Sequence, residues 1–432
     1  MSLKKNDEIK LNIESVTSEG SALGRYNGLA VFVFGAVPGD VVEAHIIKVS
    51  KNYAVGIIKE IIEKSPFRIE SDCPVSDKCG GCTFRSMTYE KELQSKLDFV
   101  NGNMERIAKL PIRCEEIIGA SDILRYRNKA QYPVCIQGNG FCAGFYAYKS
   151  HRIVPAADCL LQPAEFKAGV EAFEKWALAA NVSSFDEKSG RGLLRHIYFR
   201  KAFATGEIMA CAVINGSSVP EPQMLVSFLQ SALPGLKSVV LNINKNKTNV
   251  ILGEKTKLLW GSEKVTDMLL GKKFIISPQS FYQVNHAQCE KLYSAAAELA
   301  GLSGSETVLD MYCGAGTVGI SLSDKCKSLC GIEIVPQAVE NAIENARLNN
   351  LSNAEFICAD AYEGAKILTQ KGVRPDVVIL DPPRKGCQRE IFDIIAGLGV
   401  KKIVYISCNS ATLARDLQIL SQAGYNAKRL KA

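Results

Sequence analysis

The stretch that decides the fold lies at residues 308–319 and reads VLDMYCGAGTVG. A short apolar run predicts a strand, which leads into a glycine-rich turn and then a helix. Glycines in such a turn let the backbone approach a nucleotide closely. Glu333 follows at the tip of the next predicted strand, where a carboxylate suits two ribose hydroxyls. The pattern predicts a dinucleotide or S-adenosylmethionine site, and a tight turn without a ligand is the alternative.

Strands and helices alternate around this stretch from residue 271 onward. Helical segments such as residues 336–349 separate the predicted strands, which are the short apolar runs at 308–311, 329–334, 355–358, 376–380 and 402–407. Strands separated by helices indicate a parallel sheet with helices on both faces. Residues 271–432 are therefore predicted to form a Rossmann-like α/β domain.

Asp381-Pro382-Pro383-Arg384 follows the predicted strand 376–380. Ligands of parallel sheets bind at the carboxyl ends of the strands. An acid followed by two prolines at this edge is typical of methyltransferases and atypical of hydride-transfer enzymes. The prolines stiffen a loop on which a substrate base can lie. The motif favours S-adenosylmethionine over a dinucleotide, and a purely structural loop is the alternative.

Cys408 follows the next predicted strand, so its thiol should lie on the same sheet edge as Gly314, Glu333 and Asp381. A cysteine at a strand end is more often inert, but the two neighbouring loops reverse that expectation. C5 of uracil is too weakly nucleophilic to take a methyl group. A thiolate that adds to C6 makes C5 enolate-like, and it is also a good leaving group. Cys408 is therefore the predicted nucleophile.

The chain contains 15 cysteines and begins with a polar, Lys-rich segment that does not resemble a signal peptide. No stretch approaches the length of a membrane helix, so we expect a cytoplasmic protein without a membrane partner. Disulfides are disfavoured in that compartment. Cys73, Cys79 and Cys82 lie close together, and Cys159 is a candidate fourth ligand. Four thiolates suit zinc or an iron–sulfur cluster, and the spacing leaves both open.

The part of the chain before residue 271 is predicted to form two further domains. Residues 1–62 have the short strands and turns of a small β-barrel, and residues 63–270, which carry the cysteine group, read as a mixed α+β central domain. Expected strands of the barrel lie at 8–15, 29–34, 41–49 and 54–60, and a helix is expected at 89–109.

Basic residues suggest contact with nucleic acid, although weakly. The net charge is +7, and residues 1–110 carry 15 basic and 15 acidic side chains, so the excess lies in residues 111–432. Arg125, Arg127 and Lys129 are interleaved with Tyr126, a pattern that suits phosphates and stacked bases. A solvated strand face is an equally good interpretation.

Together these motifs resemble the RNA uracil-5-methyltransferase family over nearly the whole chain. The closest resemblance is to the branch that acts on 23S rRNA and carries a [4Fe-4S] cluster. It implies an RNA-binding TRAM barrel, OB-like in fold, for residues 1–62. It also implies that the cluster is held by Cys73, Cys79, Cys82 and Cys159.

The resemblance also assigns roles at the sheet edge. FYQVN at 281–285 is similar to the F-x-Q-x-N segment of the family, and a simple helix cap is the alternative interpretation of that segment. The implied contacts with S-adenosylmethionine are Gln283, Tyr312, Gly314, Glu333, Asp360 and Asp381. Cys408 matches the nucleophile of the family motif S-C-N-x-x-T.

The expected reaction is methyl transfer from S-adenosylmethionine to C5 of a uridine in 23S rRNA, through a covalent bond between Cys408 and C6. The enzyme is expected to act as a monomer on a uridine flipped out of its stack. The same reaction on tRNA is the nearest alternative. The cysteine group and the barrel argue against it, because the tRNA branch usually lacks both.

One departure from the family pattern concerns the general base, a Glu located well after the nucleophile. Here the last residue comes 24 positions after Cys408, and the last acid is Asp416, predicted on a helix. Residues 427–431 look like the start of another strand. These features predict a C-terminally truncated chain that releases product slowly, or a catalytically impaired RNA-binding fragment. An iron–sulfur electron carrier and an RNA cytosine-5-methyltransferase fit the motifs less well.

Overall fold

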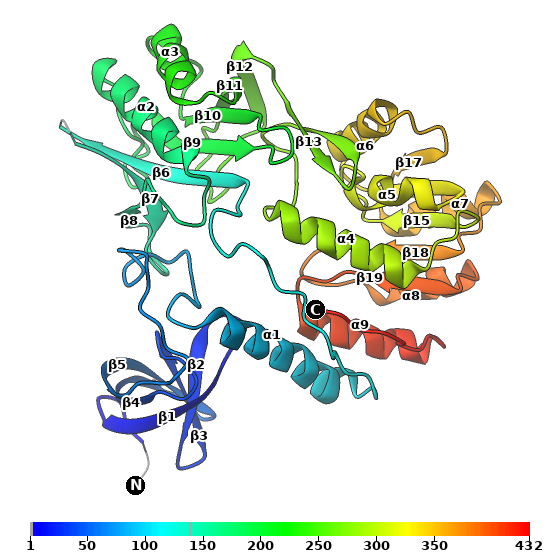
Figure 1. Ribbon diagram of the computed structural model, residues 1–432, viewed down its shortest axis with the longest axis horizontal. Coiled ribbons are helices and arrows are strands. Elements are labelled where there is room, and N and C mark those ends of the chain that lie inside the picture. The colour runs from blue at the N-terminus through cyan, green and yellow to red at the C-terminus, as the bar shows by residue number, and fades with distance from the viewer. Residues whose placement is uncertain (1–2, 139) are drawn as a thin grey trace. The chain divides into compact units, whose positions relative to one another are not determined.

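The computed structural model describes residues 3–138 and 140–432 and contains two compact units (Figure 1). One unit comprises the chain up to Gly119, together with Tyr146–Arg152 and Lys428–Ala432. The other comprises Ala120–Phe145 and Ile153–Ala427. Within the described residues, no helix combines the length and the apolar character that crossing a bilayer requires.

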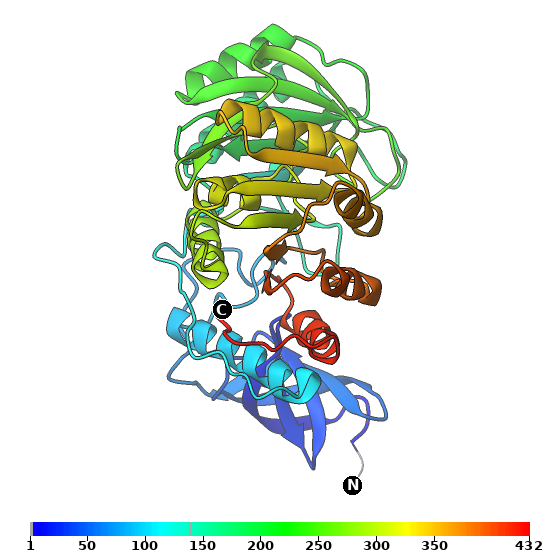
Figure 2. The same cartoon turned by 90° about the vertical axis from the view of Figure 1, so that its right-hand side faces the viewer.

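The first unit begins with a closed five-stranded barrel, drawn in blue in Figure 2. Its strands, in the spatial order β1-β2-β3-β5-β4, are β1 (Glu8–Val16), β2 (Ser21–Tyr26), β3 (Leu29–Phe34), β4 (Val41–Val49) and β5 (Tyr53–Glu63). Alternate apolar side chains, such as Val31, Val33 and Ile46, are fully buried inside. The predicted barrel is confirmed, and β2 is a strand that the sequence pattern did not indicate.

A helix follows the barrel in the first unit, where the sequence predicts one. Helix α1 (Tyr89–Asn103) runs into one π-helical turn, Met104–Ala108. The hydroxyl of Thr88 caps the helix by accepting a hydrogen bond from the Lys91 N–H at 3.4 Å.

The seven-stranded sheet has the order β12-β11-β10-β9-β6-β7-β8. Its strands are β6 (Lys129–Gln137), β7 (Gly140–Tyr146), β8 (Ile153–Pro155), β9 (Leu194–Lys201), β10 (Ile208–Ile214), β11 (Leu236–Ile243) and β12 (Lys255–Gly261). Helices α2 (Glu165–Ala179) and α3 (Pro222–Ala232) cover one face through a core that includes Phe173, Trp176 and Phe199. This part has the mixed α+β character that the sequence predicts.

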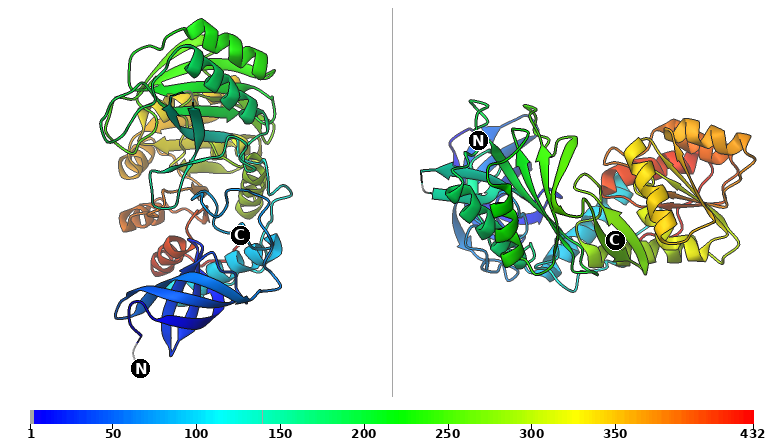
Figure 3. Two further views of the ribbon diagram at one scale, coloured as in Figure 1. Left: turned by 90° about the vertical axis from the view of Figure 1, so that its left-hand side faces the viewer. Right: turned by 90° about the horizontal axis from the view of Figure 1, so that it is seen from above.

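The five-stranded sheet is entirely parallel, with the order β17-β16-β15-β18-β19. Its strands are β15 (Thr307–Met311), β16 (Ser328–Glu333), β17 (Ala354–Cys358), β18 (Val377–Leu380) and β19 (Lys402–Tyr405). One face carries α4 (His286–Ala300), α5 (Thr317–Leu322) and α6 (Pro336–Leu348), and the other carries α7 (Ala361–Gln370), α8 (Arg389–Gly397) and α9 (Ser410–Gln422) (Figure 3). The predicted Rossmann-like fold is confirmed.

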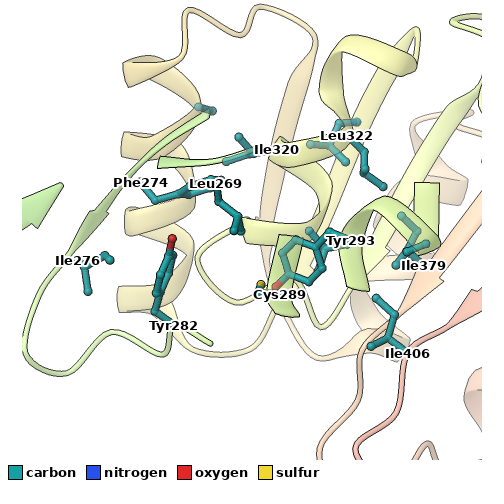
Figure 4. Close-up of a cluster of buried hydrophobic side chains, with 14 of the residues drawn as sticks. Leu269, Phe274, Ile276, Tyr282, Cys289, Tyr293, Ile320, Leu322, Ile379 and Ile406 are labelled. Carbon is teal, nitrogen blue, oxygen red and sulfur yellow. The ribbon is translucent and has the colours of Figure 1, made fainter. Parts of the chain in front are cut away.

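A single hydrophobic cluster connects this parallel sheet with the second face of the seven-stranded sheet. Tyr198 and Met209 from the seven-stranded sheet belong to the same cluster as Ile379 of β18 and Tyr293 of α4. The hairpin of β13 (Val265–Leu269) and β14 (Lys272–Ile276) contributes to it, as Figure 4 shows. The segment between β14 and α4 is therefore held against a packed core.

The strand expected at residues 427–431 is wrong, because these residues form no strand. The chain instead makes two backbone hydrogen bonds with an extended segment of the first unit. The N–H of Ala432 donates to Glu116 O at 3.1 Å, and the N–H of Ile118 donates to Ala432 O at 2.7 Å.

Candidate active site

The carboxyl ends of the parallel strands bring the predicted site residues to one sheet edge. Glu333 ends β16, the glycine turn follows β15, Asp381 follows β18 and the Cys408 loop follows β19. These four strands are consecutive neighbours in the sheet. Crevices at the carboxyl ends of such strands are the usual ligand sites of open α/β sheets.

The glycine turn after β15 is built from residues with left-handed backbone. Tyr312, Gly314 and Gly316 have φ values of 69°, 54° and 78°. A Cβ on Gly314 would meet open space, so a ligand can approach the backbone at this position. The Gly314 N–H donates to Glu333 Oε2 at 3.1 Å, and the Val335 N–H donates to Oε1 at 2.9 Å. The Glu333 carboxylate is thereby oriented at the turn.

Three acidic side chains, those of Asp310, Glu333 and Asp381, gather at this edge. Burial raises the pKa of Asp381 to about 6. Burial, together with the charges of Asp381 and Glu333, raises the pKa of Asp310 to about 7. Asp310 Oδ2 accepts a hydrogen bond from the Gly319 N–H at 2.8 Å, and its Oδ1 has no hydrogen-bond partner within residues 3–138 and 140–432. Such an edge favours a cationic ligand, and the sulfonium and ammonium groups of S-adenosylmethionine fit this requirement.

Cys408 is exposed in the short loop between β19 and α9. Asn409 caps α9, because its Oδ1 accepts hydrogen bonds from the N–H groups of Ala411 at 2.9 Å and Thr412 at 3.3 Å. The Ser407 hydroxyl donates to Asn409 O at 3.0 Å. The loop is therefore held by its own hydrogen bonds while the thiol faces solvent.

Other cysteines near this edge differ from Cys408 in their burial. Burial raises the pKa of Cys289 to about 12 and that of Cys387 to about 11. Cys313 is also buried, and its pKa is raised well above the usual value. Such thiols are poor nucleophiles near neutral pH because the thiolate is the reactive form.

Two polar residues beside the Cys408 loop had no role in the sequence prediction. Asp416, on α9 as predicted, is completely buried, and its Oδ1 accepts from Arg415 Nε at 2.8 Å. The Arg415 guanidinium also donates to Lys385 O, in the loop after Asp381, at 2.8 Å. The sequence indicated this connection only through an Arg-Asp pair on the helix that follows Cys408.

The segment that carries Gln283 is held by an extended part of the chain before β6. The Asn128 N–H donates to Val284 O at 2.8 Å, and Asn128 Nδ2 donates to Gln283 O at 2.8 Å. Asn285 caps α4 by accepting from the Gln288 N–H at 3.1 Å, so the segment ends in a helix cap. Phe281 is 74% exposed.

Asp360 follows β17 and caps α7. Its Oδ1 accepts hydrogen bonds from the N–H groups of Tyr362 at 2.9 Å and Glu363 at 3.0 Å. Its position after β17 puts it at the same sheet edge as Glu333, one strand further from the glycine turn.

The basic residues predicted to contact RNA divide into two groups. Arg125 is engaged within the protein, since it pairs with Asp158 at 2.8 Å and donates to Cys159 O at 3.0 Å. Arg127 and Lys129 are half-buried and form no ion pair with any residue that the structure describes.

The four predicted cysteine ligands are divided between the two units. Cys73, Cys79 and Cys82 lie on a loop of the first unit, and Cys159 belongs to the second. Across residues 3–138 and 140–432, no three His, Cys, Asp or Glu side chains come together in a way that would hold a metal ion. Thiolates are chemically suited to such a cluster.

Comparisons with known proteins agree with the geometry of the sheet edge. The family model described as tRNA (Uracil-5-)-methyltransferase matches residues 236–429, and the TRAM domain model matches residues 3–59. An uncharacterized RNA methyltransferase of Halalkalibacterium halodurans is 41% identical over 427 residues, which cover 99% of this chain and 93% of the relative. An uncharacterized RNA methyltransferase of Listeria monocytogenes is 40% identical over 429 residues, covering 99% and 94%.

A solved structure is similar over nearly the whole chain. It is the Pyrococcus abyssi tRNA (uracil-54, C5)-methyltransferase in complex with S-adenosyl-L-homocysteine, with a TM-score of 0.76 and 25% identity, covering 95% of this chain and 92% of that one. The matches to the family models, the full-length relatives and this structure lead to one conclusion. The chain belongs to the RNA uracil-5-methyltransferase family and is an S-adenosylmethionine-dependent enzyme.

Proposed function

We propose that the enzyme methylates C5 of a uridine in 23S rRNA and that Cys408 forms a covalent bond with C6 of that uridine. The observation that carries the proposal is the position of Cys408. Its exposed thiol follows β19, next to the strand that leads to Asp381 and two strands from the glycine turn. The nucleophile and the cofactor residues thus share one sheet edge.

The chemistry at Cys408 explains why a thiol is required. Its thiolate adds to C6, and the electron pair of the C5–C6 bond moves toward C5 and the O4 carbonyl. S-adenosylmethionine, when bound, supplies an electrophilic methyl group for C5. The Cys408 sulfur then leaves C6 when a base removes the proton from C5, which restores the double bond.

The residues at the edge have separate roles in binding the cofactor. Glu333 would accept hydrogen bonds from the ribose hydroxyls, since its carboxylate is already oriented at the turn. Asp381 would lie near the positively charged part of the cofactor. The other proposed contacts are Gln283, Tyr312, Gly314 and Asp360.

Substitution of the nucleophile tests the mechanism. We expect Cys408→Ala to abolish methyl transfer to rRNA, while Cys358→Ala, which removes an exposed thiol at the end of β17, retains it. RNA that contains 5-fluorouridine should form a complex with the enzyme that survives denaturation, because fluorine at C5 blocks the elimination step. Efficient turnover by Cys408→Ala, or no covalent complex, would contradict the mechanism.

The branch of the family determines whether the protein carries an iron–sulfur cluster. We infer a [4Fe-4S] cluster on Cys73, Cys79, Cys82 and Cys159, supported by the resemblance of these cysteines to the ligands of the family branch that carries such a cluster. Iron and sulfide analysis and a visible spectrum of anaerobically purified protein test it, and a featureless spectrum with stoichiometric zinc would refute it.

The second candidate substrate is tRNA, which the name of the Pyrococcus abyssi enzyme favours. Incubation with separate rRNA and tRNA from cells that lack the gene, followed by mapping of the methylated base, distinguishes the two. We expect the enzyme to act in the cytoplasm as a monomer.

A further inference from the structure

Three basic side chains come together where β6, β9 and the segment before α4 meet. Lys129, the first residue of β6, lies directly opposite Arg200 of β9 in an antiparallel pair. Residues directly opposite each other in such a pair project from the same face of the sheet. Arg127 lies two residues before Lys129 and forms a backbone bridge with Asn285.

Arg200 is almost completely buried, with 1% of its surface exposed. Its Nε donates to Tyr198 Oη at 2.7 Å, and one terminal nitrogen donates to Ser280 O at 3.2 Å. The other terminal nitrogen is buried and has no hydrogen-bond partner among the residues that the structure describes. A guanidinium stays charged at any relevant pH, and no carboxylate among the described residues pairs with this one.

Lys129 and Arg127 share this lack of a counter-charge. Desolvation, together with the charges of Arg200 and Arg127, lowers the pKa of Lys129 to about 8. Neighbouring cations are paired, because Lys201 contacts Glu165 and Arg125 contacts Asp158. An unpaired charge is costly to bury, and like charges repel, so the cluster has the electrostatic character of a site for an anion.

We propose that Arg127, Lys129 and Arg200 bind a phosphodiester group of the RNA substrate. Arg127 and Lys129, which are half-buried, would contact the phosphate, and the charge of Arg200 would act from beneath them. The site borders the 280–285 segment, which carries Gln283 and the exposed Phe281. A phosphate bound here would fix the RNA backbone beside the cofactor edge. This assignment rests on the proposed function, since it presumes an RNA substrate.

The cofactor carboxylate is the other anion available at this edge. It is a poorer candidate, because the same molecule carries a sulfonium and an ammonium group that three unpaired cations would repel. A phosphodiester carries no positive charge of its own. A guanidinium and an ammonium are also the side chains that recognise phosphate most often.

Salt dependence of RNA binding tests the site with the full chain. The probe is a labelled 20-nucleotide oligouridylate, with affinity measured between 50 and 200 mM salt. On a single strand, each lost phosphate contact reduces the slope of log K against log salt by about 0.7. Because the three cations share one phosphate, we expect a reduction of up to about this size for Lys129→Gln and for Arg127→Gln. We expect Lys129→Arg to keep the wild-type slope. Lys257→Gln, an exposed lysine of β12, should leave it unchanged.

Two further measurements make the outcome decisive. Binding of S-adenosylhomocysteine without RNA should be the same in wild type, Lys129→Gln and Arg127→Gln. Weaker binding of S-adenosylhomocysteine with an unchanged salt slope would assign the cluster to the cofactor carboxylate and overturn the proposal. Equal slopes in all variants would also overturn it. A reduced slope in a protein that methylates no uridine would leave the phosphate site standing and refute only the proposed reaction.

A structural role for Lys129 predicts a different result. Lys129→Met removes an unpaired, partly buried charge, so the melting temperature of the free protein should be unchanged or higher. Its affinity for the oligouridylate should fall. A lower melting temperature with unchanged RNA affinity would indicate that Lys129 only supports the fold.

Discussion

The hydroxyl of Tyr405 donates a hydrogen bond to Asp416 Oδ2 at 2.6 Å, and the same oxygen accepts from the Cys387 N–H at 2.8 Å. Tyr405 ends the strand before Cys408, and Asp416 lies on the helix after it. Cys387 belongs to the loop that follows Asp381. The buried carboxylate therefore connects the nucleophile loop with the Asp381 loop.

The first prediction concerns this connection. Tyr405→Phe should lower the free energy of unfolding by about 1.5–3 kcal/mol, because it removes a hydrogen bond to a charged group. The matched control is Tyr425→Phe. The Tyr425 hydroxyl donates to a neutral acceptor, Val400 O, at 2.8 Å, so the expected loss is about 0.5–1.5 kcal/mol. Urea denaturation measures both losses of unfolding free energy. Equal losses would show that the hydrogen bond to Asp416 stabilises the fold no more than one to a backbone carbonyl.

The second prediction concerns the acid at the tip of β16. Glu333→Gln leaves one acceptor oxygen where the carboxylate has two, so we expect the affinity for S-adenosylmethionine to fall about tenfold or more, equivalent to about 1.4 kcal/mol. Glu340→Gln changes an acid that accepts a hydrogen bond from Gln337 on the surface of α6 and should leave the affinity unchanged. Calorimetry measures the two dissociation constants. Similar affinities for wild type and Glu333→Gln would remove Glu333 from the cofactor site.

The third prediction is the pH dependence of cofactor binding. The pKa of Asp381 is raised to about 6 by burial, and a bound cation favours the charged carboxylate and lowers that pKa. Binding therefore releases a proton below pH 6, so the affinity for the cofactor should rise with pH up to about 6. Above that pH, Asp381 should cause no further change in the affinity.

Asp381→Asn provides the control for that profile. The amide does not titrate, so binding should be weaker and should lose the change near pH 6. Asp310, whose pKa is about 7, lies in the same group of acids and can add a second, separate change. An unaltered profile in Asp381→Asn would assign the pH dependence to another residue.

The fourth prediction is the pH dependence of RNA binding. The pKa of Lys129 is lowered to about 8, and a bound phosphate would raise it again. Binding therefore takes up a proton above pH 8, and the affinity for oligouridylate should fall as the pH rises beyond that value. Arg127 and Arg200 stay charged throughout, and burial raises the pKa of the neighbouring Tyr198. Lys129→Arg should remove the decline, and a decline that persists in this variant would place the titrating group elsewhere.

Local patterns in the sequence were sufficient for much of the fold. The glycine turn at 308–319, the strands of the parallel sheet and four strands of the barrel follow from apolar runs and turn residues. Parallel strands present their carboxyl ends at one edge, so the common location of Glu333, Asp381 and Cys408 also followed from the sequence. Strand β2 and helices α2 and α3 were not assigned from the sequence, and the packing of these two helices on the seven-stranded sheet is seen only in the folded chain.

Only the tertiary structure decided which charged residues have partners. Arg125 and Lys129 are four positions apart and look equivalent in the sequence. In the structure, Arg125 forms an ion pair with Asp158, whereas Lys129 lies opposite another cation, Arg200. Asp416 likewise acquires its role from Cys387, 29 positions away. Strand and turn preferences act over a few residues, whereas burial and charge pairing depend on groups that only the folded chain brings together.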